Sequence, residues 1–155
     1  MANVKTGSQA SWNGDYVENL DGAKSLAPGD SGKVFMVDQG SAFTVNLPKL
    51  STNIAGWHAK FIVKTADSNA VHIMAWGLTL AGGTGDSGST NDGDTVILKE
   101  MATTDAGAAT ATSQDGVILA SGATVGDSIE VFTDGSSWYA TSFVADAAHS
   151  DDIDG

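Results

Sequence analysis

Short strand-like stretches recur through this chain and are separated by turn residues. Phe43, Val45 and Leu47 alternate with polar residues, which is the period of a half-buried strand, and Pro48 ends the run. Such stretches follow one another at intervals of about 8–12 residues, which is typical of a β-sandwich or β-barrel. An excess of Gly, Asp, Ser and Thr, with little Glu, Lys or Leu, also favours strands and turns over helices.

We expect about eight strands, each marked by apolar, β-branched or aromatic residues. They are 33–37, 43–47, 57–64, 71–76, 95–98, 117–119, 129–132 and 138–144. The pair Asp134-Gly135 predicts a tight hairpin between the last two, and the close spacing of 57–64 and 71–76 predicts another. The chain has 155 residues, the size of one domain. The expected fold is therefore all-β, a single-domain antiparallel β-sandwich or barrel with an N-terminal arm.

Three segments differ in pattern. Residues 1–28 show no clear period and are interpreted as an arm or peripheral segment, which ends where Pro28-Gly29-Asp30 indicates a turn. Residues 29–146 carry the strand pattern and form the predicted β domain. Residues 147–155 are acidic, and we expect this tail to be disordered or loosely held.

The charge balance excludes several function classes. The chain has 19 Asp and Glu residues against 7 Lys and Arg residues, all lysines, for a net charge of −12. A nucleic-acid-binding protein needs clustered cations, so we predict no nucleic-acid partner. The absence of cysteine excludes disulfides, thiol nucleophiles and cysteine-zinc sites. No apolar run approaches 18 residues, so we predict no membrane-spanning helix.

The tetrapeptide Gly-Asp-Ser-Gly occurs twice, at 29–32 and 85–88. It surrounds the nucleophile of chymotrypsin-like proteases, which also need a histidine base and an orienting acid. No histidine precedes Ser31, and the two that precede Ser87 lie fewer than 30 residues before it. Because Gly, Asp and Ser also build turns, we interpret both copies as turn chemistry and predict no enzymatic activity.

Metal binding has weak signals. The loop at 82–94 offers oxygen ligands for Ca²⁺, but without EF-hand spacing, so a solvated loop is favoured over a calcium site. Those ligands are Asp86, Asn91, Asp92 and Asp94. His58 and His72 lie on expected strands, where a hairpin would pair them, and His149 lies in the tail. Two histidines do not make a zinc site, so we predict no metal and no cofactor.

Aromatic residues fall into two groups. Those on or beside expected strands are predicted core residues: Phe35, Phe43, Trp57, Phe61, Trp76, Phe132, Trp138 and Phe143. Trp12 and Tyr16 lie instead in the aperiodic N-terminal segment, together with Leu20. An aromatic side chain in an arm needs a surface to bury against, which is either its own domain or a neighbouring subunit.

Four motifs follow one another in a set order. They are DSGKVFMV at 30–37, FTVNLP at 43–48, KFIVKTA at 60–66 and VGDSIEVFTDGSSWYA at 125–140. In this order they resemble the head decoration proteins of tailed phages, especially those of marine and cyanobacterial hosts. The resemblance covers most of residues 30–145. It leaves out the first 28 residues and the loop at 82–94.

The resemblance implies a structural virion protein on the outer capsid surface, with a β-rich fold and often a trimeric assembly. Such a protein binds the major capsid protein lattice and reinforces it, and no catalytic residues are carried over. We predict that Trp12, Tyr16 and Leu20 contact the capsid or a sister subunit. The alternative is a receptor- or glycan-binding fibre or knob module, in which exposed aromatic rings beside Asp and Asn loops would bind sugars.

Overall fold

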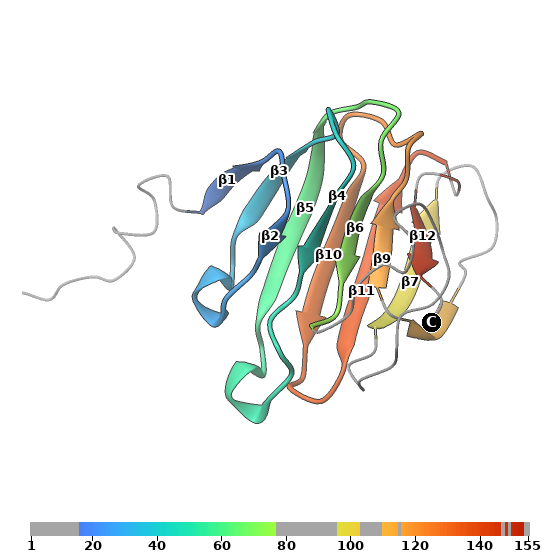
Figure 1. Cartoon of the computed structure of the whole chain (residues 1–155). Coiled ribbons are helices and arrows are strands. Elements are labelled where there is room, and N and C mark those ends of the chain that lie inside the picture. Colours follow the sequence, from blue (N-terminus) through green and yellow to red (C-terminus); the bar gives the residue numbers. More distant parts are fainter. Residues whose placement is uncertain are drawn as a thin grey trace, which may run out of the picture.

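A computed structural model describes residues 16–76, 96–102, 110–114, 116–146, 148 and 150–153. In these residues, twelve strands form two sheets, and the helical pieces are the single 3₁₀ turns Pro28–Asp30 and Thr52–Ile54. The two sheets pack as the layers of a sandwich (Figure 1). The predicted all-β class is confirmed, and the sandwich is the form it takes.

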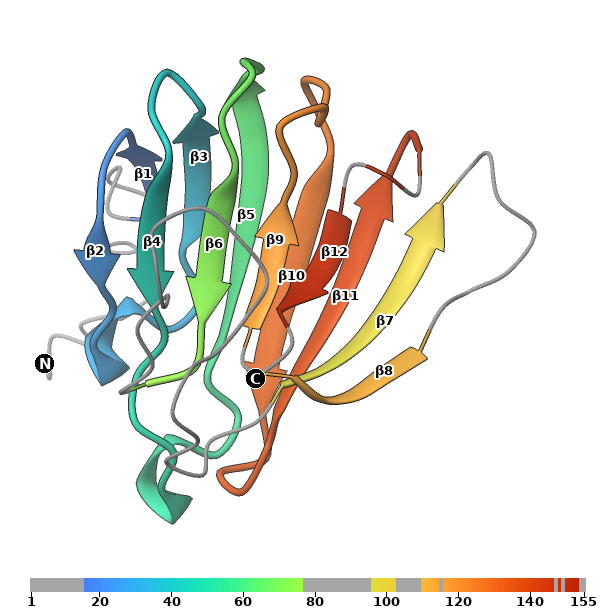
Figure 2. The ribbon, with the colours of Figure 1, turned by 45° about the vertical axis from the view of Figure 1, so that its right-hand side comes forward.

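Each sheet is best followed from edge to edge (Figure 2). The seven-stranded sheet runs β1 (Val17–Leu20), β3 (Val34–Asp38), β5 (His58–Thr65), β10 (Ser128–Thr133), β11 (Trp138–Val144), β7 (Val96–Ala102) and β8 (Thr110–Gln114). The five-stranded sheet runs β12 (Ser150–Ile153), β9 (Gly116–Leu119), β6 (Val71–Met74), β4 (Phe43–Asn46) and β2 (Lys24–Ser25).

The first six strands alternate between the two sheets, which corrects the antiparallel prediction. β1, β3 and β5 lie parallel in one sheet, and β2, β4 and β6 lie parallel in the other. Each connection crosses to the opposite layer, so the chain has reversed twice when it returns to the same sheet. With β7 parallel to β11, five of the ten strand pairings are parallel.

Of the two predicted hairpins, one is confirmed and one is wrong. β10 and β11 form an antiparallel hairpin at Asp134-Gly135, where Gly135 has a φ of 94° that favours glycine. The segments at 57–64 and 71–76 do not pair, because β5 belongs to the seven-stranded sheet and β6 to the five-stranded sheet. A short connection is equally suited to crossing between layers.

The core lies between the layers and follows the alternation seen in the sequence. Phe43, Val45 and Leu47 are buried as predicted, and Phe35 stacks on Phe61 with ring centroids 5.1 Å apart. Trp57 meets Trp138 edge to face at 5.2 Å. The core prediction is wrong for three aromatic residues, which are between 44% and 49% exposed: Trp76, Phe132 and Phe143.

Both predicted peripheral segments contribute strands. Residues 17–20 and 24–25 form the edge strands β1 and β2, so the described part of the predicted arm belongs to the sandwich. Residues 1–15 lie outside the described residues. In the tail, residues 150–153 form β12, which pairs antiparallel with β9. β12 covers the hydrogen-bonding groups that β9 would otherwise leave at an open edge, and corrects the expectation of a loosely held tail.

Candidate functional site

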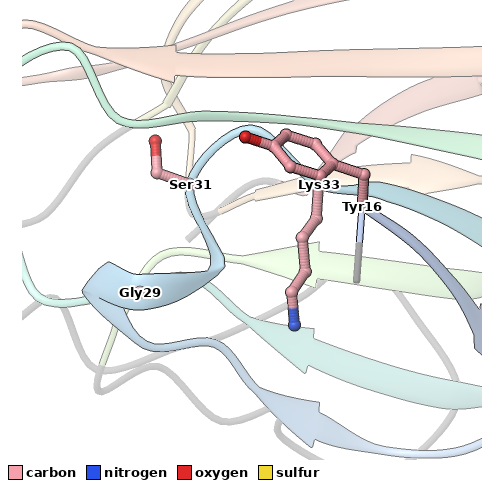
Figure 3. A pocket seen from close by; sticks show the side chains of 4 residues that line it. All are labelled: Tyr16, Gly29, Ser31 and Lys33. Carbon is pink, nitrogen blue, oxygen red and sulfur yellow. The ribbon is translucent and has the colours of Figure 1, made fainter. Parts of the chain in front are cut away.

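A small pocket of about 150 Å³ opens where the chain enters the sandwich. It is lined by Tyr16, Gly29, Ser31 and Lys33, which come from the start of β1 and from the turn that leads into β3. Figure 3 shows the hydroxyl group of Ser31 and the ammonium group of Lys33 pointing in different directions. Three of the four residues therefore offer polar side-chain groups, and Tyr16 also offers an aromatic ring.

Gly32 lies in this turn, close to the rings of Tyr16 and His58. The amide of Gly32 donates a hydrogen bond to the carbonyl of His58 at 2.7 Å, and the amide of Val34 donates to the carbonyl of Tyr16 at 2.7 Å. A Cβ atom on Gly32 would lie 3.5 Å from Cε1 of Tyr16 and 3.9 Å from Nε2 of His58. Its φ of 86° also favours glycine. Tyr16 is held here while remaining 45% exposed.

An ionic cluster lies beside the pocket and joins the two sheets. The ammonium group of Lys33 pairs with Asp30 at 2.6 Å and with Glu18 at 3.0 Å. Lys24 also pairs with Glu18, and its ammonium lies 5.4 Å from the ring centroid of Phe35. Since Glu18 is on β1 and Lys24 is on β2, this contact links the edges of the two layers.

The contacts of the cluster favour the ionised forms of Glu18, Asp30 and Lys33. The hydrogen bond from Lys24 is the largest influence on Glu18 and, with that from Lys33, lowers the pKa of this carboxyl. Burial alone would raise the pKa of Asp30, but hydrogen bonds from the Ala27 amide and Lys33, together with the lysine charges, lower it. Hydrogen bonds to Asp30 and Glu18 raise the pKa of Lys33. These directions suit a structural cluster, since none moves a group toward titration at neutral pH.

The turn at 29–32 brings Ser31 close to His58, which the sequence did not predict, but the contacts are structural. The hydroxyl of Ser31 accepts a hydrogen bond from the backbone amide of His58 at 3.3 Å. Nδ1 of His58 lies 3.1 Å from the carbonyl of Gly56, which accepts its hydrogen bond. Asp30 accepts from the Ala27 amide at 2.8 Å. Among the described residues, no carboxylate hydrogen-bonds to the His58 ring. Ser31 and His58 therefore lack the orienting acid of a catalytic triad.

Of the predicted contact residues, the structure leaves only one available among those it describes. Tyr16 is exposed at the pocket, whereas Leu20 is 3% exposed and packs in the core. Leu20 therefore cannot serve as a surface contact while the sandwich is intact. Trp12 lies outside the described residues.

The histidine and metal predictions have separate outcomes. His58 and His72 are on strands of different sheets, so they do not pair across a hairpin. His149, the second Gly-Asp-Ser-Gly and the loop at 82–94 lie outside the described residues. Within the described ranges, no three side chains of the metal-binding types come together. Nor does any helix in those ranges have the length and apolar character needed to cross a membrane.

Sequence reasoning missed a second surface, on the outward side of β10 and β11. Phe132 and Phe143 project from it, and Tyr139 stacks on Phe132 with ring centroids 5.0 Å apart. The alternation of the sequence could have indicated this surface. Phe132 is two residues from the charged Glu130 and points to the same side of β10, whereas Val131 between them points to the core.

We found no match to this chain among protein-family models, curated proteins or solved structures.

Proposed function

We propose that this chain is a structural, non-enzymatic virion protein that binds the outer surface of a tailed-phage capsid and stabilises the lattice of its major capsid protein. The ordered motifs between residues 30 and 140 support this proposal through their resemblance to head decoration proteins. The observation that carries it is the exposed Tyr16 ring at the edge of the sandwich, where its backbone carbonyl accepts a hydrogen bond from Val34.

The edge position of Tyr16 suits attachment to another protein. It precedes β1, which is the edge strand of the seven-stranded sheet and pairs with β3 on its inner side. The outer side of such a strand presents backbone donors and acceptors that a strand of a partner can pair with. The ring adds a large contact area at low entropic cost, because it has few rotatable bonds and its carbonyl is already held by Val34.

Rigidity at this edge also favours a cementing role. The cluster of Glu18, Lys24, Lys33 and Asp30 ties β1 to β2 and to the turn before β3. A load applied at the edge strand would therefore pass into both layers of the sandwich. A protein that reinforces a capsid needs such a connection between its contact surface and its core.

The test is co-sedimentation of the full-length protein with undecorated capsids of the phage that encodes it. We expect saturable binding by the wild type, weaker binding by Tyr16→Ala and weaker binding after removal of residues 2–14, which include Trp12 but spare β1. Val125→Ala is the matched control, since Val125 is 69% exposed and belongs to another loop. Absence of wild-type binding would reject the function, whereas wild-type occupancy by both altered proteins would reject the contact.

A receptor- or glycan-binding fibre or knob module is the second candidate, favoured by one observation. The stacked rings of Phe132 and Tyr139 are accessible, and the Tyr139 hydroxyl hydrogen-bonds to Asp134 at 3.2 Å. Aromatic rings beside a carboxylate can bind sugars through stacking and hydrogen bonds. Binding to a glycan array or to host cells, without binding to capsids, would favour this candidate.

A further inference from the structure

The outward side of β5, β10 and β11 carries a compact group of exposed and half-buried side chains that we call the aromatic face. Its members are Lys60, Glu130, Phe132, Tyr139 and Phe143. The strand register brings them together, because Glu130 lies opposite Lys60 on one side and Phe132 lies opposite Tyr139 on the other. The face belongs to the middle of a sheet, so it is held in place by strands on both sides (Figure 2).

Charged groups and aromatic rings are in contact within this face. The ammonium of Lys60 pairs with Glu130 at 2.7 Å and lies 5.8 Å from the ring centroid of Phe143. Phe132 and Tyr139 stack nearly parallel, with an angle of 15° between their rings. An ion pair therefore lies beside exposed rings on adjacent strands. Phe132 and Phe143 still expose 49% and 44% of their surface to solvent.

The charge of this face differs from that of the chain. The five residues contain one cation and one anion, whereas the whole chain has a net charge of −12. Asp134 adds a carboxylate at the Tyr139 end of the face, where it accepts a hydrogen bond from the Tyr139 hydroxyl, but the five residues themselves add no net charge to a contact between two copies. Exposed apolar surface of this kind is unfavourable in water and marks interaction sites when it is grouped.

We propose that two copies of this chain associate through the aromatic face about a two-fold axis. In such a contact the same surface meets itself, so Lys60 of each copy can pair with Glu130 of the other. A face with one cation and one anion side by side is complementary to its own rotated copy. The exposed rings fill the surrounding contact and lose their water. This inference does not depend on capsid binding, and it differs from the trimer implied by the family resemblance, in which two unlike surfaces would meet.

The first measurement is the mass of the full-length protein by sedimentation equilibrium over a range of concentrations. We expect a dimer for the wild type, and a rise of about tenfold or more in the dissociation constant for Phe143→Asp. Val125→Asp adds the same charge at an exposed apolar residue outside the face and should leave the dimer intact. Thermal unfolding of each variant shows that the fold is retained.

The second measurement tests the two-fold pairing through charge exchange. Lys60→Glu and Glu130→Lys should each weaken self-association, because each variant brings like charges together across the axis. An equimolar mixture of the two variants should restore a heterodimer, since every cross-contact then joins opposite charges. A role for Lys60 and Glu130 within one chain alone does not predict this rescue.

Several results would overturn the proposal. They are a wild type that stays monomeric at all concentrations, a trimeric mass, or a mixture that associates no better than either variant alone. If the wild type is monomeric and the Phe143→Asp variant loses capsid or glycan binding, the aromatic face binds that other partner instead. Restoration of the dimer in the mixture, with Val125→Asp unaffected, would support the proposal.

Discussion

The pocket end of the sandwich and the aromatic face differ in where their ion pairs lie. At the pocket, Glu18 and Asp30 are engaged by lysines of the same chain, and the contacts join two layers. On the aromatic face, Lys60 and Glu130 pair within one sheet and stay accessible, with side chains 35% and 48% exposed. The pocket cluster joins the two sheets through several charges, whereas the single pair on the aromatic face joins neighbouring strands of one sheet and contributes less to the fold.

The largest effect is expected at the hairpin that supports the aromatic face. A Cβ atom on Gly135 would lie 3.0 Å from the carbonyl oxygen of Ser51, and the φ of 94° disfavours any other residue. We expect Gly135→Ala to lower the free energy of unfolding by about 2–3 kcal/mol. Gly56→Ala is the matched control, because Gly56 has a φ of 86° but no atom within 4 Å of its Cβ position. Equal losses in chemical denaturation would contradict the role of the Ser51 contact.

A smaller loss is expected from the ionic cluster. Lys33→Ala removes pairs to both Asp30 and Glu18 and should cost about 1 kcal/mol of unfolding free energy at low salt. Lys60→Ala removes a single ion pair, which is more accessible to solvent. It should therefore cost less unfolding free energy than Lys33→Ala. Urea unfolding at low and high salt measures both variants. A larger loss for Lys60→Ala would remove the distinction between the two regions.

Acid should weaken the pocket end of the sandwich. The folded pKa values of Glu18 and Asp30 are lowered, so their contribution to stability is fully present above the unfolded pKa of about 4. It is lost as the pH falls through the lowered folded values. We expect Glu18→Gln to make the fall in melting temperature between about pH 6 and about pH 3 shallower than in the wild type. An unchanged pH profile would contradict this account of the cluster.

The smallest effect on the fold is expected for the exposed rings. Phe132→Ser removes a side chain that is half accessible, so we expect a loss of less than about 1 kcal/mol in unfolding free energy at a concentration where the protein is monomeric. The same change at the buried Phe61 should cost about 3–5 kcal/mol. Similar losses in the two variants would show that Phe132 contributes to the core and would contradict its place on an exposed face.

The sequence predicted those features that depend on neighbouring residues along the chain. The alternation at 43–47 identified the buried side of β4, and Asp134-Gly135 identified the hairpin, because turn geometry depends on the two residues at its centre. The excess of Asp, Gly and Ser indicated strands and turns for the same local reason. Tyr16, which the sequence places outside the strand pattern, directly precedes β1 and is exposed, and its role as a contact residue stays a prediction.

Only the tertiary structure decided which strand lies beside which. Period-2 alternation fixes the two sides of a strand but not its partner, so the parallel winding of β1 to β6 and the edge role of β12 could not be inferred. The meeting of Ser31 with His58, the burial of Leu20 and the exposure of Phe143 follow from that winding. Local sequence sets turns and alternation, whereas the pairing of distant strands depends on how all the buried side chains pack together.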